Sequence, residues 1–197
     1  MNKIISTNPS TGEVLGEVEA TSQQEIKAKV NKAREALKDW KDLGIEGRVK
    51  ALRKVVEGFK KRKQEFAELA SKEMGMPISQ SVHDIGGAID YFNWYLDNAV
   101  RYLSPEVVYE DDETTHTVHY EPVGVVAAIT PWNFPASNFV WMCGQNLIVG
   151  NTVVFKDSED VPLCGKLIEE VFNEAGLPEG VFSEVYGAGG VGDFLVH

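Results

Sequence analysis

Two neighbouring segments, Gly124 to Pro135 and Gly150 to Glu159, constrain the fold of this chain more than any other feature. The first is an apolar run followed by a turn bounded by prolines, which presents Trp132 and Asn133. The second is an apolar run that ends in Lys156 and nearby acids. Two buried strands joined by a helix form a right-handed parallel unit, and such sheets bind ligands at the carboxyl ends of their strands. The sequence therefore predicts an α/β fold with a ligand site at these two turns.

The first hundred residues predict a hairpin followed by three helices. Turn residues at 8–12 separate two short apolar runs. Ser22 and Glu25 form a capping box at the start of a helix over about 22–41, and apolar residues at helical spacing predict further helices over about 46–74 and 79–102. The last of these carries an aromatic group, for which helix packing is a simpler interpretation than a ligand platform. Its members are Tyr91, Phe92, Trp94 and Tyr95.

The second half predicts a second hairpin and then alternating strands and helices. Alternating residues at 107–109 and 115–120 flank an acidic turn, and the exposed edges of such a hairpin invite pairing with another subunit. Strands are expected at 123–129, 152–156 and 181–185, with helices over about 136–149, 161–175 and from 190 onward. We divide the chain into a helical part (1–104), a hairpin (105–122) and the first βαβ units of a parallel sheet (123–197).

Charge and composition exclude several classes of partner. The net charge of −11 over 197 residues argues against nucleic acid and anionic membranes, because the long-range field repels polyanions. Cys143 and Cys164 lack metal-ligand spacing, and the four histidines are scattered, so no metal site is expected. The N-terminal residues are too poor in apolar side chains for a signal peptide and no apolar run is long enough to span a membrane, so we expect neither. We expect a cytoplasmic protein with reduced thiols.

Asn133 is the residue of the first turn with the clearest chemical use. Prolines fix the backbone on both sides, and its amide offers two donors that could stabilise a developing oxyanion without titrating. The alternative is an asparagine that bonds its own backbone in a turn.

The chain resembles the aldehyde dehydrogenase superfamily over nearly its whole length. Single motifs of this kind are weak evidence, but their order and spacing together are specific. They are Asn8 to Glu13, Lys72 to Pro77, Tyr120 to Pro135, Gly150 to Lys156, and Glu174 to Phe182. The resemblance implies the N-terminal portion of that fold: an incomplete Rossmann-like parallel sheet, N-terminal helices and a protruding β-hairpin. It also implies a homo-oligomer, dimer or tetramer, and the motifs resemble those of semialdehyde dehydrogenases, including succinate-semialdehyde types. By this resemblance residues 1–104 are the helical part of the cofactor domain, 105–122 the hairpin of the oligomerisation region, and 123–197 the first βαβ units of the NAD-binding domain.

The resemblance implies roles for matched positions. Asn133 matches the asparagine of the oxyanion hole, Lys156 the lysine that bonds the adenosine ribose, and Glu159 the acid that reaches a ribose hydroxyl. A carboxylate at Glu159 would repel a 2′-phosphate, so NAD is expected in preference to NADP. The other cofactor-binding positions are Ile129, Thr130, Pro131, Trp132 and Ser158.

Gly187 to Gly192 also fits the spacing of a dinucleotide-binding loop, with a strand before it and a helix after it. Gly189 and Gly192 are therefore included as cofactor-binding residues. The pattern alone is weak, because glycine-rich turns also arise for steric reasons.

The nucleophilic cysteine and the glutamate base that the family uses lie in motifs that follow the region present here. Cys143 aligns with an apolar position, so both cysteines are interpreted as structural. Three further departures from the family pattern are Met142, the Gln145–Asn146 pair and Asp157. The chain looks like the front part of a subunit that oxidises a small aldehyde, and is expected to be inactive alone. The alternative is a non-catalytic module that binds nucleotide or pairs with full-length subunits.

Overall fold

The computed structural model describes residues 3–197, and its centre is a three-stranded parallel sheet. The strands are β5 (Val125–Ile129), β6 (Thr152–Lys156) and β7 (Phe182–Glu184), in the order β5-β6-β7. The middle strand β6 is fully buried, as expected for a parallel strand covered on both faces. The predicted incomplete parallel sheet is therefore confirmed.

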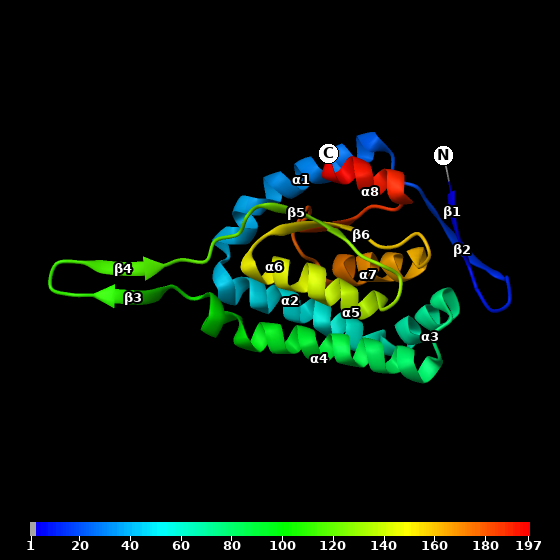
Figure 1. Ribbon diagram of the computed structural model, residues 1–197, viewed down its shortest axis with the longest axis horizontal. Helices are drawn as coiled ribbons and strands as arrows, with labels where there is room; N and C mark the ends of the chain where they lie inside the picture. The colour runs from blue at the N-terminus through cyan, green and yellow to red at the C-terminus, as the bar shows by residue number, and fades with distance from the viewer. Residues whose placement is uncertain (1–2) are drawn as a thin grey trace.

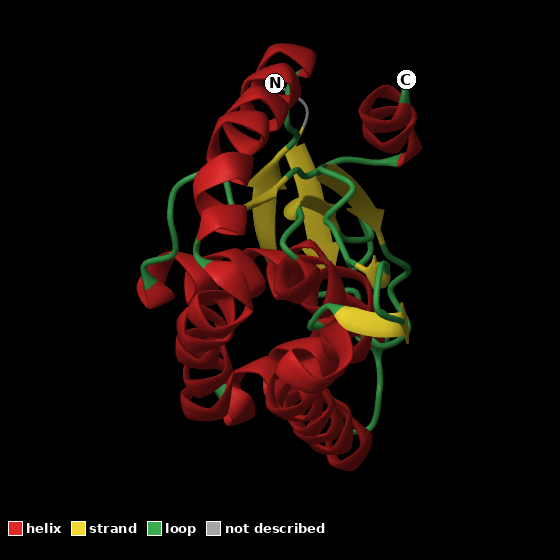
Figure 2. Cartoon of the chain, turned by 90° about the vertical axis from the view of Figure 1, so that its left-hand side faces the viewer, coloured by secondary structure: helices red, strands yellow, loops and turns green. Residues whose placement is uncertain are grey.

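Helices cover both faces of this sheet (Figures 1 and 2). On one face lie α1 (Gln23–Asp42) and α8 (Gly189–Val196). On the other lie α7 (Pro162–Ala175) and the helical segment between β5 and β6, with α2 (Gly44–Lys61) and α4 (Ile78–Leu103) packed outside them. The α1 capping box forms as predicted: the Ser22 amide donates to Glu25 Oε2 at 2.7 Å, and the Glu25 amide donates to Ser22 Oγ at 3.3 Å.

The prediction of a single helix over 46–74 is wrong, because the helix is interrupted at Arg62. Helix α2 ends at Lys61, and α3 (Lys63–Met74) begins after Arg62, whose backbone leaves the helical region at φ −100°, ψ 14°. The Arg62 side chain binds Glu65 next to it and Glu170 and Glu174 on α7. Arg62 thus links the break between α2 and α3 to α7.

The expected single helix over 136–149 is also interrupted. It consists of α5 (Pro135–Phe139), a π-helical turn η1 (Val140–Gly144) and α6 (Gln145–Val149). The wider turn keeps Val140, Cys143 and Gly144 in the core and turns Trp141 and Met142 outward. Such turns are frequent beside functional sites.

The turn before α5 is anchored through Phe139, which is fully buried at the centre of the core. Its ring contacts five other phenylalanines with centroids between 5.6 and 6.5 Å away. These are Phe59, Phe92, Phe155, Phe172 and Phe182. The proline-bounded turn is therefore attached to a rigid part of the molecule.

Two antiparallel hairpins complete the fold. The first pairs β1 (Lys3–Thr7) with β2 (Val14–Glu19), as predicted. The second pairs β3 (Glu106–Glu110) with β4 (Thr115–Val118) and projects away from the body (Figure 1). Every residue of β3 and β4 is exposed.

The aromatic group on α4 only partly fits the packing interpretation. Phe92 is in the core and Tyr95 packs against it, but Tyr91 and Trp94 are about half exposed. Trp94 contacts Tyr95 and Tyr102 on its own helix instead. Helical periodicity places residues on a face but does not say how wide the buried part of that face is.

Candidate functional site

The carboxyl ends of β5 and β6 place the two predicted turns side by side. Ile129 and Lys156 are register partners at the ends of the two strands. One residue further on, the Thr130 amide donates to the Lys156 carbonyl at 3.1 Å. Thr130 Oγ1 also donates to Asp157 Oδ1 at 3.0 Å, and both side chains are buried.

Lys156 is a buried cation on the second turn. Its Nζ donates to the Asp157 carbonyl at 3.1 Å and lies 3.4 Å from Glu159 Oε2. The Glu159 side chain is 42% exposed, whereas that of Lys156 is 4% exposed. The Glu159 carboxylate is therefore accessible to solvent, and the buried Lys156 ammonium group lies next to it.

Trp132 and Glu159 line one hollow of about 280 Å³ between the two turns and the first hairpin. Ile5, Thr7 and Pro9 complete this hollow together with Glu73 and Met74 of α3 and with Asp160. Pro131 and Trp132 are exposed, and Thr130 is buried behind them. The two turns thus share a surface.

Asn133 lies exposed on the first turn, and its side-chain oxygen is used while its nitrogen is not. Asn133 Oδ1 accepts a hydrogen bond from Asn138 Nδ2 at 3.3 Å, and Asn138 Nδ2 also donates to the Pro131 carbonyl at 3.1 Å. Within residues 3–197 the Asn133 amide nitrogen donates to no protein group, and its side chain does not bond its own backbone. The two N–H donors of this exposed side chain are therefore free of protein partners among the described residues.

The glycine segment begins α8 beside the same strand ends. A Cβ at Gly192 would lie 3.6 Å from Ile129 Cδ1 and 3.6 Å from Lys156 Cδ. A Cβ at Gly189 or Gly190 would meet nothing within 4 Å, so the start of α8 is open. Gly187 is different: a Cβ there would lie 2.2 Å from Val191 Cγ2, so glycine is required for packing. Gly192 therefore joins the site, and Gly189 flanks it.

Buried carboxyls that sequence patterns did not single out hold both turns in place. Glu73 on α3 accepts hydrogen bonds from the Leu163 and Cys164 amides at 2.9 and 2.8 Å, and so caps α7 after the second turn. Asp84 on α4 accepts from the side chain and backbone of Ser137, at the start of α5 after the first turn. Burial raises the pKa of both carboxyls.

Asp157 is the buried acid closest to the two turns. Burial raises its pKa to about 8, although hydrogen bonds from Ser158 and Thr130 oppose this shift. Asp157 Oδ1 accepts from the Ser158 amide at 2.9 Å as well as from Thr130. Its second oxygen, Oδ2, is buried without a hydrogen-bond partner in the described structure.

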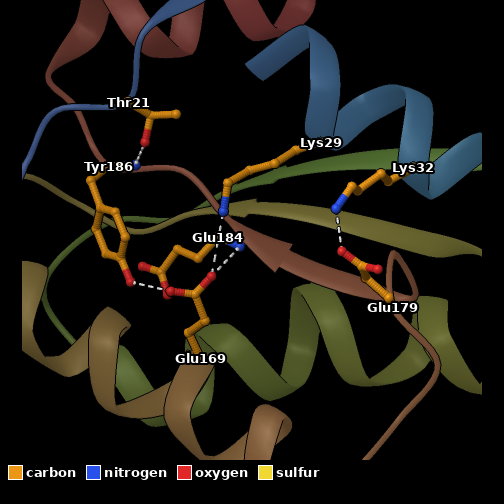
Figure 3. A network of polar contacts seen from close by, with 7 residues as sticks. All are labelled: Thr21, Lys29, Lys32, Glu169, Glu179, Glu184 and Tyr186. Atoms are coloured by element: carbon orange, nitrogen blue, oxygen red, sulfur yellow. Dashed lines mark hydrogen bonds and ion pairs between the residues drawn. The ribbon is translucent and has the colours of Figure 1, made fainter. Parts of the chain in front are cut away.

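Glu184, at the end of β7, is the most enclosed acid among the described residues. It is fully buried, and neither carboxyl oxygen has a hydrogen-bond partner within residues 3–197. Lys29 and Tyr186 converge instead on Glu169 beside it, with Tyr186 Oη donating to Glu169 Oε2 at 2.8 Å (Figure 3). Burial, followed by repulsion from Asp157 and Glu169, raises the pKa of Glu184 well above its usual value. A Cβ at Gly165 would lie 2.0 Å from Glu184 Oε1, so α7 needs glycine there.

Both cysteines are structural, as predicted. Cys143 and Cys164 are fully buried, and burial raises the pKa of each thiol well above its usual value. A thiolate at either position would be strongly disfavoured. Within residues 3–197 no group of three potential ligands is placed to hold a metal ion. The same residues include no helix with the length and apolar character needed to cross a membrane.

Comparison with known proteins places these features in one family. The model of the "Aldehyde dehydrogenase family" matches residues 1–197. The chain is 35% identical over 191 residues to a D-glyceraldehyde dehydrogenase (NADP(+)) of Picrophilus torridus, covering 96% of this chain and 38% of that protein. It is 34% identical to a protein of Synechocystis described as "Probable succinate-semialdehyde dehydrogenase [NADP(+)]", covering 98% and 42%.

A solved structure agrees with these sequence matches. The crystal structure of PnpE in complex with nicotinamide adenine dinucleotide, from Pseudomonas sp. WBC-3, superposes with a TM-score of 0.91 at 32% identity. The match covers 98% of this chain and 40% of that chain. The chain thus spans about two fifths of the length of the proteins it matches.

Proposed function

Because the chain belongs to the aldehyde dehydrogenase family, we propose that its full-length protein oxidises a small aldehyde of the semialdehyde type to the carboxylic acid. NAD is the proposed oxidant, in preference to NADP. The segment described here supplies the nucleotide-binding surface and the oxyanion-stabilising amide.

The observation that carries this proposal is the meeting of the two turns at the ends of β5 and β6. Asn133 with its free amide nitrogen stands on one turn, and the Lys156–Glu159 pair stands on the other. Ligands of open α/β sheets bind at this edge. An aldehyde-oxidising site needs a hydrogen-bond donor for the oxyanion, and a pair of groups that binds the ribose within reach of that donor.

The residues present fit a dinucleotide. Lys156 has three N–H donors, of which two are directed at the Asp157 carbonyl and Glu159, so a donor remains for a ribose hydroxyl. The open backbone at Gly189 and Gly190 leaves room for a phosphate beside the start of α8. When bound, the nicotinamide would accept the hydride that the aldehyde carbon loses.

The protein groups then have separate tasks. Asn133 Nδ2 donates to the substrate oxygen as negative charge develops on it. Lys156 donates to the adenosine ribose and Glu159 accepts from it. Ile129, Thr130, Pro131 and Trp132 form the wall beside the nucleotide, with Ser158 on the facing turn and Gly189 and Gly192 along α8.

The choice between NAD and NADP rests on Glu159. Names of the matched proteins include both nucleotides, so family membership leaves the choice open. The Glu159 carboxylate is partly exposed at the proposed ribose position and would repel a 2′-phosphate.

Glu159→Gln is expected to relax discrimination against NADP by about 1 to 3 kcal/mol, because it removes this repulsion. Steady-state kinetics of the full-length protein with both nucleotides give the kcat/KM ratio. Glu179→Gln is the matched control, since it makes the same change at an exposed glutamate away from the two turns. If kcat/KM for NAD and NADP change in parallel in Glu159→Gln, another group selects the nucleotide.

The alternative function is a non-catalytic module that binds nucleotide or pairs with other subunits through β3 and β4. The complete exposure of this hairpin favours a role in pairing, because Val107, Val108 and Tyr109 present apolar surface to solvent. A homo-oligomer formed through this hairpin is compatible with either function. Deleting residues 107–118 and measuring the mass in solution tests the pairing.

The isolated 197-residue chain is expected to form no NADH from a panel of semialdehydes. Both of its cysteines are buried with raised pKa values, so no thiolate is available as the nucleophile within residues 3–197. Turnover that disappears in Cys143→Ala would contradict the structural assignment of that thiol.

A further inference from the structure

Among the described residues, the Thr130–Asp157 contact is the only side-chain hydrogen bond between the two turns, and it lies one position beyond the β5–β6 ladder. Ile129 and Lys156 are the last register partners, and Thr130 and Asp157 follow them directly. The hydroxyl donates to Oδ1 at 3.0 Å, and the two residues are only 5% and 4% exposed. Water therefore does not compete for this bond as it would at the surface.

Asp157 Oδ1 also fixes the second turn from within. It accepts from the Ser158 amide at 2.9 Å, so one oxygen atom holds both the first turn and the backbone of the second. Its partner oxygen, Oδ2, has no hydrogen bond to any described residue. The bridging geometry therefore depends on Oδ1 alone, which accepts in the ionised and in the neutral acid.

We propose that Asp157 is a positioning residue: through Thr130 and the Ser158 amide it fastens the turn that carries Trp132 and Asn133 to the turn that carries Ser158 and Glu159. This bridge sets the spacing between the nucleotide-binding and oxyanion groups. The inference rests on the proposed function, because the two turns need a fixed spacing only when one ligand contacts both.

The test compares two Thr→Val substitutions at opposite ends of the sheet in the full-length protein. Thr130→Val removes the bridging hydroxyl. Thr152→Val is the matched control, because Thr152 is a fully buried threonine at the start of β6 whose Oγ1 donates to the Ala33 carbonyl at 2.9 Å, away from the turns. Both lose one buried hydrogen bond, so a purely structural role predicts similar effects for the two.

Thr130→Val and Asp157→Ala are each expected to weaken NAD binding roughly three- to tenfold, the range for one hydrogen bond. The double mutant should bind NAD no more weakly than the single mutant with the lower affinity, because both substitutions break the same hydrogen-bonded bridge. Asp157→Asn should restore affinity, since its Oδ1 still accepts. Equal losses in Thr152→Val and Thr130→Val, or additive losses in the double mutant, would overturn the proposal.

Amide hydrogen exchange at Ser158 separates this inference from the proposed function. Faster exchange in Thr130→Val and Asp157→Ala, but not in Thr152→Val, supports the bridge even in a protein that binds no nucleotide. Unchanged exchange in Asp157→Ala would overturn it. If the unmodified protein bound no NAD, the proposed function would be overturned instead. The Thr130–Asp157 bridge would then be tested by amide hydrogen exchange at Ser158 alone.

Discussion

Asn133→Ala is expected to lower kcat of the full-length protein by roughly a hundredfold or more while leaving the Kd for NAD nearly unchanged. An oxyanion donor acts mainly on charge that develops during the reaction, so its loss affects turnover more than ground-state binding. The turn is anchored by prolines and by buried Phe139, so the position of the Asn133 amide should be rigid and its loss hard to replace.

The rival account of Asn133 makes it a residue that stabilises the turn through Asn138. That account predicts a lower Tm and weaker nucleotide binding together. Measurement of kcat, Kd for NAD and Tm on one variant separates the two. Asn98→Ala serves as control, because Asn98 is an exposed asparagine that bonds the Trp94 carbonyl on α4, away from the turns. Loss of stability with normal turnover per folded molecule would end the oxyanion assignment.

Glu184→Gln is expected to stabilise the protein at neutral and alkaline pH, and the gain should grow as the pH rises. The pKa of Glu184 is raised in the folded state, so the carboxyl stays protonated there while it ionises in the unfolded chain. Folding then takes up a proton above the unfolded pKa, near 4.5, and stability falls with increasing pH until the folded pKa is reached. The slope from one such group is about 1.4 kcal/mol per pH unit.

Urea unfolding of the unmodified protein and of Glu184→Gln at pH 5, 7 and 9 measures this difference. The two free energies of unfolding should be closest at pH 5, and the gap between them should widen at pH 7 and again at pH 9. Glu179→Gln is the control, since Glu179 is an exposed acid paired with Lys32 and its removal should produce no growing gain. Parallel stability curves for Glu184→Gln and the unmodified protein would mean that Glu184 is solvated in solution.

Glu184 and Asp157 also show why the burial of acids escaped sequence reasoning, which identified Asp157 only as a departure from the family pattern. Each acid directly follows or ends a strand, a position that in sequence terms is equally compatible with a solvated turn. Their burial depends on α7 packing across the sheet, which Gly165 permits by leaving space for Glu184 Oε1. Glu73 and Asp84 are similar, because each caps a helix more than 50 residues away in the sequence.

The sequence by itself determined the local elements and their order. The capping box, both hairpins and the three parallel strands follow from spacing and turn chemistry, and the family resemblance drawn from the motifs is confirmed. Such patterns involve residues that are close in sequence or lie along one strand, so they can be interpreted without knowledge of the tertiary packing. The side-by-side position of the two turns was also predictable, because neighbouring parallel strands end at the same edge of the sheet.

Only the tertiary structure decided where helices break and which polar groups are enclosed. The helix is interrupted between α2 and α3 at Arg62, whose side chain binds acids of α7. In the π-helical turn, Gly144 packs closely against the ring of Phe92. The bridge from Thr130 to Asp157 likewise joins residues 27 positions apart. These features depend on the volumes and charges of segments that are distant in sequence and meet only in the folded chain. The raised pKa of a buried carboxyl has the same origin, because burial by those segments is its largest cause.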